Sequence, residues 1–88
     1  MFNYQYIQWT MDFLNLPMEK KIKTLYTEGD FVMSIRYYGY KINLYLLGSE
    51  FFEVFINHKQ AIVERIQLLD RSHSRIKFYT DQITLQLN

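Results

Sequence analysis

The chain has 88 residues, a net charge of +1, no cysteine and an aromatic fraction of 18%. This length predicts one domain (1–88), and the 49% hydrophobic and 22% charged fractions are typical of a soluble globular protein. The near-neutral charge argues against a dedicated non-specific nucleic-acid binder. The missing cysteines exclude disulfides and thiolate metal sites. Since we find no signal peptide and no stretch of roughly 20 apolar residues, we expect a cytoplasmic protein without a membrane partner.

Two helices are predicted before residue 30. Across 2–14, large apolar residues recur at helical spacing and form one broad stripe, namely Phe2, Tyr6, Trp9 and Phe13. Pro17 suits the first turn of a second helix, with Asn15 or Leu16 as its N-terminal cap. Gly29 is well placed as the C-terminal cap of that helix. Both helices are interpreted as packing on a sheet.

Residues 30–70 predict a four-stranded antiparallel meander. Apolar residues alternate along the predicted strands 30–38, 41–47, 50–57 and 61–69. The last strand alternates imperfectly, and a bulge near Glu64 and Arg65 would restore its pattern. Gly39-Tyr40 and Gly48-Ser49 are two-residue hairpin signals, because glycine supplies the positive φ of a type II′ turn. Loops this short force neighbouring strands to be antiparallel.

One face of this sheet is clearly apolar, and the other is predicted to carry Tyr45, Phe51 and Phe55. A solvated face would carry more charge, so a helix, a second subunit or a ligand should cover part of it. We expect the helices to lie mainly against one face, although they could divide between the two.

A third helix is predicted to begin after a cap at Asp70 or Ser72 and to run to about Gln82. Residues 83–88 could form the end of this helix, a tail or an added edge strand. The fold class is therefore α+β, with two N-terminal helices, a four-stranded antiparallel β-meander and a C-terminal helix. The predicted core consists of Trp9, Phe13, Ile22, Leu25, Ile35, Ile42, Leu44, Phe52, Val54, Ile56, Ile66, Ile76 and Tyr79, and Ile83 is expected to face inward with the last two.

Three strand motifs carry a resemblance. They are LYLL at 44–47, FFEV at 51–54 and VERI at 63–66. With these patterns the chain resembles a family of small uncharacterised bacterial single-domain proteins that has no assigned activity. The resemblance implies the sheet and supplies no functional residues.

No catalytic or metal signature stands out, so an enzyme is less expected than a non-enzymatic protein. None of the serines 34, 49, 72 and 74 lies in a Gly-x-Ser-x-Gly elbow. His58 and His73 lack a clear third ligand, so we expect no metal and no cofactor. Glu50, Glu53 and Glu64 could approach one another for acid–base chemistry. The favoured interpretation is structural, with Glu53 paired across the strands to Arg65 or Lys41.

Two candidate binding sets remain. Aromatic and cationic residues lie together around the first hairpin, where they could stack bases and hold phosphates: Arg36, Tyr38, Tyr40, Lys41 and Tyr45. The aromatic second face adds Phe51 and Phe55. A smaller basic cluster, Arg71, His73 and Arg75, could bind an anion at the start of the third helix or be ordinary surface.

Our first functional hypothesis is a non-enzymatic protein-interaction module that self-associates as a homodimer, because the chain is too short to cover all its aromatics. The alternative is a small RNA-binding or RNase-like factor that uses the Arg/Tyr/Lys set. A helix pair followed by an antiparallel sheet also resembles, in coarse order only, ribosome-dependent toxin endoribonucleases. A third possibility is a pocket for an apolar or aromatic small molecule between sheet and helices.

Overall fold

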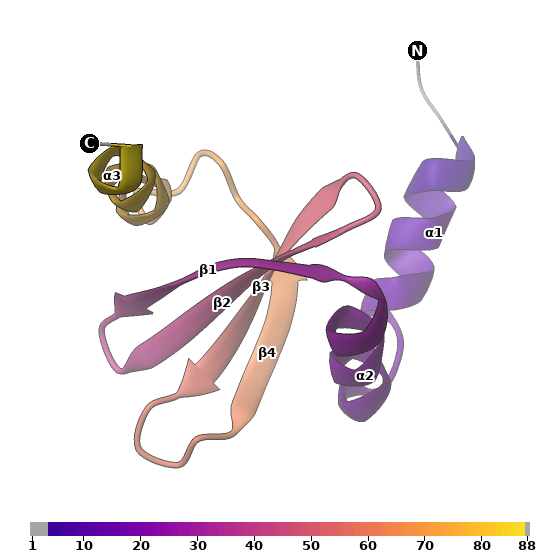
Figure 1. Ribbon diagram of the computed structural model, residues 1–88. Coiled ribbons are helices and arrows are strands. Elements are labelled where there is room, and N and C mark those ends of the chain that lie inside the picture. The colour runs from indigo at the N-terminus through magenta and orange to yellow at the C-terminus, as the bar shows by residue number, and fades with distance from the viewer. Residues whose placement is uncertain (1–3, 88) are drawn as a thin grey trace.

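The computed structural model describes residues 4–87 and confirms the predicted α+β order (Figure 1). The elements in chain order are α1 (Tyr4–Leu14), α2 (Met18–Glu28), β1 (Asp30–Tyr37), β2 (Tyr40–Leu47), β3 (Glu50–Asn57), β4 (Val63–Leu68) and α3 (Ile76–Leu87). The four strands form one antiparallel sheet in the order β1-β2-β3-β4. The ending that the sequence left open is helical to Leu87. Phe2 and Asn88, and the side chains of Tyr6 and Ile83, lie outside what the structure describes.

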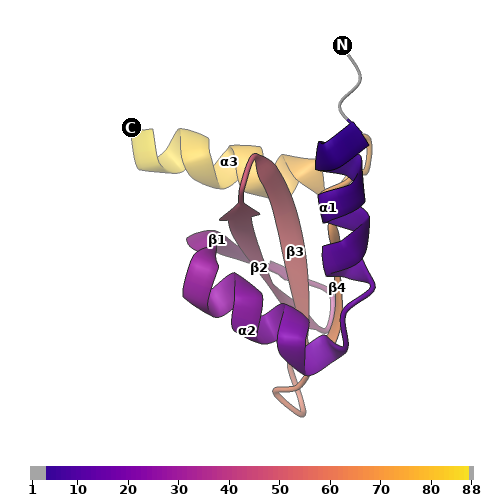
Figure 2. The same cartoon turned by 90° about the vertical axis from the view of Figure 1, so that its right-hand side faces the viewer.

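The helices divide between the two faces of the sheet. Figures 1 and 2 show α1 and α2 on one face and α3 on the other. Helix α2 contacts β1, β2 and β4, whereas α3 contacts β1. Of the two arrangements that the sequence left open, the structure shows the division between the faces, with two helices on one and one on the other. Both faces carry enough apolar side chains to need a cover.

The register between β2 and β3 shows how the aromatic residues divide between the two faces. Tyr45 lies opposite Phe52, whereas Ile42 lies opposite Phe55. Directly opposed residues of an antiparallel pair share a face, so Phe51 and Phe55 belong to the α3 face and Tyr45 to the α1/α2 face. Grouping these three aromatics on one face was wrong. Alternation within a strand does not fix its phase relative to the next strand.

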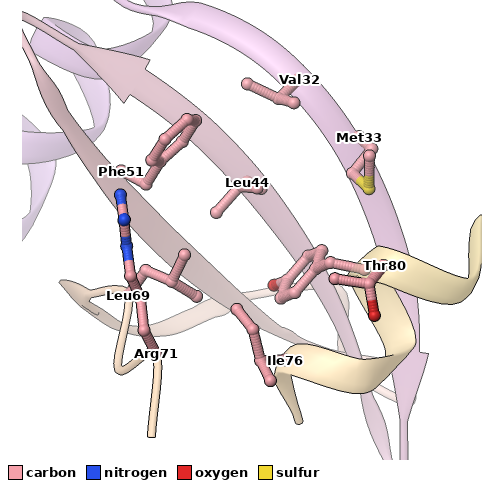
Figure 3. Close-up of a pocket in the computed structure, with 9 residues that line it drawn as sticks. Val32, Met33, Leu44, Phe51, Leu69, Arg71, Ile76 and Thr80 are labelled. Atoms are coloured by element: carbon pink, nitrogen blue, oxygen red, sulfur yellow. The ribbon is translucent and has the colours of Figure 1, made fainter. Parts of the chain in front are cut away.

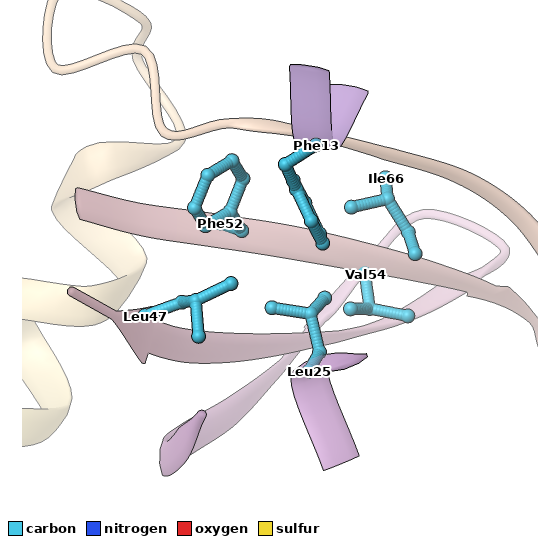
Figure 4. Packing of buried hydrophobic residues seen from close by; sticks show 6 residues of the cluster. All are labelled: Phe13, Leu25, Leu47, Phe52, Val54 and Ile66. Atoms are coloured by element: carbon cyan, nitrogen blue, oxygen red, sulfur yellow. The ribbon is translucent and has the colours of Figure 1, made fainter. Parts of the chain in front are cut away.

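The core on the α1/α2 face is built around two aromatic rings. Phe13 of α1 and Phe52 of β3 meet edge to face, with ring centroids 4.8 Å apart. The buried residues of this cluster are Phe13, Leu25, Leu47, Phe52, Val54 and Ile66 (Figure 4). Trp9 was assigned to the core, yet 39% of it is exposed. Its ring stacks on that of Phe13 and lies 6.5 Å from that of Phe52, measured between ring centroids.

The core on the α3 face comprises Met33, Ile35, Ile42, Leu44, Phe55 and Tyr79. Phe55 is fully buried, so it is not available on an open second face. Ile76 packs against this cluster as a half-buried residue, and Ile22 and Ile56 do the same on the α1/α2 face. The remaining members of the predicted core are buried as expected.

Of the two predicted hairpin loops, one agrees with the structure and one is shifted by a residue. Gly48 has φ +64° between β2 and β3, which confirms the second hairpin loop. The first loop is Tyr38-Gly39 instead of Gly39-Tyr40, because Tyr40 already pairs with Tyr37 and Asn57. Tyr38 takes the positive φ of 49° itself.

Two bulges interrupt the ladders. Phe55 pairs with Arg65 and Ile56 with Val63, so Glu64 is the additional residue and the bulge predicted there is confirmed. A second bulge at Val32 was not predicted. There Phe31 pairs with Tyr45 and Met33 with Leu44.

The helix ends differ in part from the prediction. Gly29 caps α2 as expected, but with φ −89°. Its role is steric, since a Cβ there would lie 2.7 Å from the carbonyl oxygen of Leu25. The N-terminal cap is Pro17, without a side-chain hydrogen bond, and not Asn15 or Leu16. Helix α3 begins only at Ile76, because residues 70–75 form turns before it.

The aromatic core predicts a contrast between two substitutions. Phe52→Ala removes a fully buried ring and should lower the free energy of unfolding by about 3–5 kcal/mol. Trp9→Ala serves as the comparison because part of that ring already faces solvent, and it should cost only about 1–2 kcal/mol. Urea unfolding followed by circular dichroism measures both values. Equal losses for the two variants would contradict this placement of the core.

Candidate functional site

A buried ion pair joins the sheet to α3. Glu53 lies in the middle of β3 and is fully buried, and Arg75, directly before α3, is 4% exposed. Arg75 Nη2 donates to Glu53 Oε1 at 2.7 Å, and Arg75 Nε donates to Oε2 at 2.8 Å. This two-pronged geometry is the strongest arrangement that a guanidinium and a carboxylate can form. The Tyr79 hydroxyl adds a third hydrogen bond to Oε2 at 2.8 Å.

Local structure brings the two donors to the same carboxylate. Arg75 and Tyr79 are four residues apart at the start of α3, a spacing that places side chains on the same side of a helix. The Arg75 guanidinium also lies over two aromatic rings, 5.2 Å from the centroid of Phe55 and 5.5 Å from that of Tyr37. Apolar residues thus surround a charged pair whose polar atoms are satisfied.

The predicted cluster of Arg71, His73 and Arg75 does not form one open cationic site. His73 Nδ1 accepts the backbone N–H of Arg75 at 2.9 Å and lies 3.2 Å from Arg75 Nη1. The charge of Arg75 is neutralised by Glu53. Arg71 points elsewhere, with its guanidinium 5.9 Å from the ring centroid of Phe51.

Electrostatics keep Arg75 and Tyr79 protonated. The hydrogen bond with Glu53 raises the pKa of Arg75, so the guanidinium stays charged. Burial, followed by the hydrogen bond to Glu53, raises the pKa of Tyr79 far above that of an ordinary tyrosine. The hydroxyl of Tyr79 is therefore a fixed donor at neutral pH. This network positions α3 and offers no exposed proton donor or acceptor.

A hollow lies beside this network, between α3 and the sheet. Its volume is about 340 Å³, and its lining residues are Val32, Met33, Leu44, Phe51, Leu69, Arg71, Ile76, Tyr79 and Thr80 (Figure 3). Tyr79 belongs both to the network and to the wall of the hollow. The ion pair therefore fixes one wall of this apolar hollow.

The structure separates the predicted Arg/Tyr/Lys set. Arg36 and Lys41 lie opposite each other, on the face of Ile56 that α1 and α2 partly cover. Tyr40 lies on the α3 face, where its ring meets Phe55 edge to face. These residues therefore do not form one stacking surface.

The other members of the predicted set also lie apart. Tyr38 occupies the hairpin tip and is 86% exposed. Tyr45 contacts Tyr26 and Phe31 on the α1/α2 face. Arg36 Nη1 lies 3.1 Å from Nε2 of His58, and both side chains are exposed.

Two of the three candidate carboxylates, Glu53 and Glu64, have different surroundings. Glu64 accepts a hydrogen bond from Asn57 Nδ2 at 3.0 Å, and a hydrogen bond from Tyr40 lowers its pKa. The same bond to Glu64 raises the pKa of Tyr40. Glu53 is bound to Arg75, so its expected pairing with Arg65 or Lys41 is wrong. Arg65 lies instead over the ring of Phe55, 4.0 Å from its centroid.

Sequence reasoning missed the pairing of Glu53 with Arg75, although a signal was present. Glu53 stands between Phe51 and Phe55 on the same face of β3, a position that otherwise takes apolar residues. A charge at such a position requires a buried partner. The partner is 22 residues away in sequence and precedes a helix, so the strand pattern alone could not identify it.

The comparisons with known proteins leave the function open. Protein-family models, curated proteins and solved structures gave no match. The resemblance based on the strand motifs therefore stays a prediction. Within residues 4–87, no three His, Cys, Asp or Glu side chains lie together as metal ligands would. In the same part of the chain, no helix has the length and apolar character needed to cross a membrane.

Tyr79 predicts a specific loss of stability at alkaline pH. Its pKa is higher in the folded than in the unfolded state, so above about pH 10 the unfolded chain loses this proton first. The stabilisation is complete below that pH and declines as the pH rises further. Tyr79→Phe should cost about 1–3 kcal/mol at neutral pH, because Glu53 loses a donor.

Urea unfolding at about pH 8 and about pH 11 measures this effect. The loss of stability between the two values should be smaller in Tyr79→Phe than in the unsubstituted protein. Tyr38→Phe is the control, since Tyr38 is exposed at the hairpin tip. The assignment fails if Tyr79→Phe and Tyr38→Phe show the same alkaline loss.

Proposed function

We propose that this protein is a non-enzymatic interaction module that self-associates, with β1 of one copy pairing antiparallel to β1 of a second copy. The observation that carries the proposal is a group of exposed aromatic side chains beside the open edge of β1. Tyr26 and Phe31 are 51% and 55% exposed, and both rings pack on Tyr45 at centroid distances of 5.5 and 5.6 Å.

The edge of the sheet supports this mode of pairing. Strand β1 is the first in the sheet order, so one of its edges has no partner within the described chain. It is eight residues long, and an edge of that length presents a row of backbone donors and acceptors to another strand. Figure 2 shows the C-terminal end of α3 projecting beyond β1, where the sheet of a second copy would lie.

The next residue of β1 adds to the exposed apolar surface at this edge. Val32 follows Phe31 in β1 and is 40% exposed. Aromatic residues are enriched in protein interfaces, because they combine large apolar area with few rotatable bonds. The sequence predicts a dimer through an open sheet face that carries Phe51 and Phe55. Since α3 covers that face, the β1 edge now carries the proposal.

The RNA-binding alternative has less support. Arg36 and Lys41 lie side by side on one face together with His58, which is favourable for an anion. Tyr40 lies on the opposite face, so the aromatic platform that would stack bases is divided. The expected cytoplasmic location and the bacterial resemblance stay predictions.

Size-exclusion chromatography with light scattering tests self-association at low and high protein concentration. We expect a molar mass that rises to twice the chain mass. Phe31→Lys should raise the dissociation constant by about tenfold or more, because it places a charge in the interface. Ile62→Lys is the matched control, since Ile62 is 53% exposed but precedes β4 at the other edge.

A molar mass of one chain at every concentration would contradict the proposal. Equal weakening by Phe31→Lys and Ile62→Lys would contradict the assignment to β1. The melting temperatures of both variants test whether the fold is intact. We expect little change, because both side chains are more than half exposed.

A further inference from the structure

We infer that the hollow between α3 and the sheet binds a small molecule with an apolar tail and one carboxylate, a medium-chain fatty acid or a molecule of the same chemistry. The inference rests on the lining of the hollow, on its rigid wall and on one unpaired arginine. It does not depend on self-association through β1.

The lining is almost entirely apolar. The bulge in β1 inserts Val32 between the paired residues Phe31 and Met33, and both Val32 and Met33 line the hollow. Leu44 and Phe51 form the floor from β2 and β3. A hollow of about 340 Å³ falls within the size range of small-molecule sites. An acyl chain fits such a lining because it needs no hydrogen-bond partner.

The opposite wall is held in place without a ligand. Ile76 and Tyr79 contribute this wall from α3. The Tyr79 hydroxyl donates to Glu53, and Glu53 holds Arg75 one residue before Ile76. Repositioning this wall would break the buried ion pair and leave a buried charge without its partner. A ligand therefore does not have to order the site on binding, and this favours affinity.

The charge at the border of the hollow selects the head group. Arg71 is the one charged residue that lines the hollow. Figure 3 shows its side chain running beside Leu69 toward Phe51, at one side of the apolar space. Arg71 is exposed and forms no ion pair with a carboxylate among the residues that the structure describes. A guanidinium binds a carboxylate through two parallel hydrogen bonds, so a monocarboxylate matches this single arginine.

The other arginines of this face are already engaged or lie away from the hollow. Arg75 is buried with Glu53. Arg65 lies over Phe55 and does not line the hollow. Arg65 and Arg71 are both exposed and both lie over a phenylalanine ring. Arg65 is therefore a matched control for Arg71.

Titration with sodium decanoate, kept below its micelle-forming concentration, tests the inference by methyl NMR. Resonances of Met33, Leu44 and Ile76 should shift along one saturable curve. The methyl groups of Val54 are the internal reference, because Val54 lies in the core of the α1/α2 face. Decan-1-ol and decylammonium are titrated in parallel to test the head group.

Arg71→Gln should weaken decanoate binding by about tenfold while leaving decan-1-ol binding unchanged, whereas Arg65→Gln should change neither. Thr80→Trp, which fills the hollow from α3, should abolish the shifts of Leu44 with all three probes. A protein that shows no saturable shift, or that binds decanoate no more tightly than decan-1-ol or decylammonium, would overturn the inference. Equal effects of Arg71→Gln and Arg65→Gln would overturn it as well.

Discussion

The buried carboxylate of Glu53 constrains how α3 can lie on the sheet. An ionised carboxylate in an apolar layer costs several kcal/mol unless hydrogen-bonded partners surround it. Arg75 and Tyr79 supply three donors at 2.7–2.8 Å from one helix start. A shift of α3 by one turn would leave the carboxylate without them. We interpret the pair as a device that selects one docking position for α3, more than as a source of net stability.

This docking position determines what the α3 face presents. Because α3 is fixed through Arg75 and Tyr79, Phe55 is fully buried, and the hollow between α3 and the sheet has a rigid wall. On the α1/α2 face, Phe13 and Phe52 perform the covering role by apolar contact alone. An 88-residue chain thus covers both faces of a four-stranded sheet with three helices. Apolar surface remains open at the β1 edge and in the hollow.

Much of the fold could be predicted from the sequence, because it depends on local signals. Alternation indicated four strands, Gly48 indicated a tight turn, and a break in the pattern indicated the bulge at Glu64. What could not be predicted depends on contacts between elements. The register that places Phe55 beneath α3 is one example, and the bulge at Val32 is another. Arg75 looked like part of a surface cluster, since nothing local distinguishes it from Arg71.

A double-mutant cycle between Glu53 and Arg75 tests the central constraint most directly. The free energies of unfolding of Glu53→Leu, Arg75→Met and the double variant would be measured in urea. Each single change leaves a buried group unpaired, so each should cost about 3–5 kcal/mol, and the double variant should cost much less than their sum. Costs that add within about 0.5 kcal/mol would contradict the account, because independent residues cannot fix the position of α3 together.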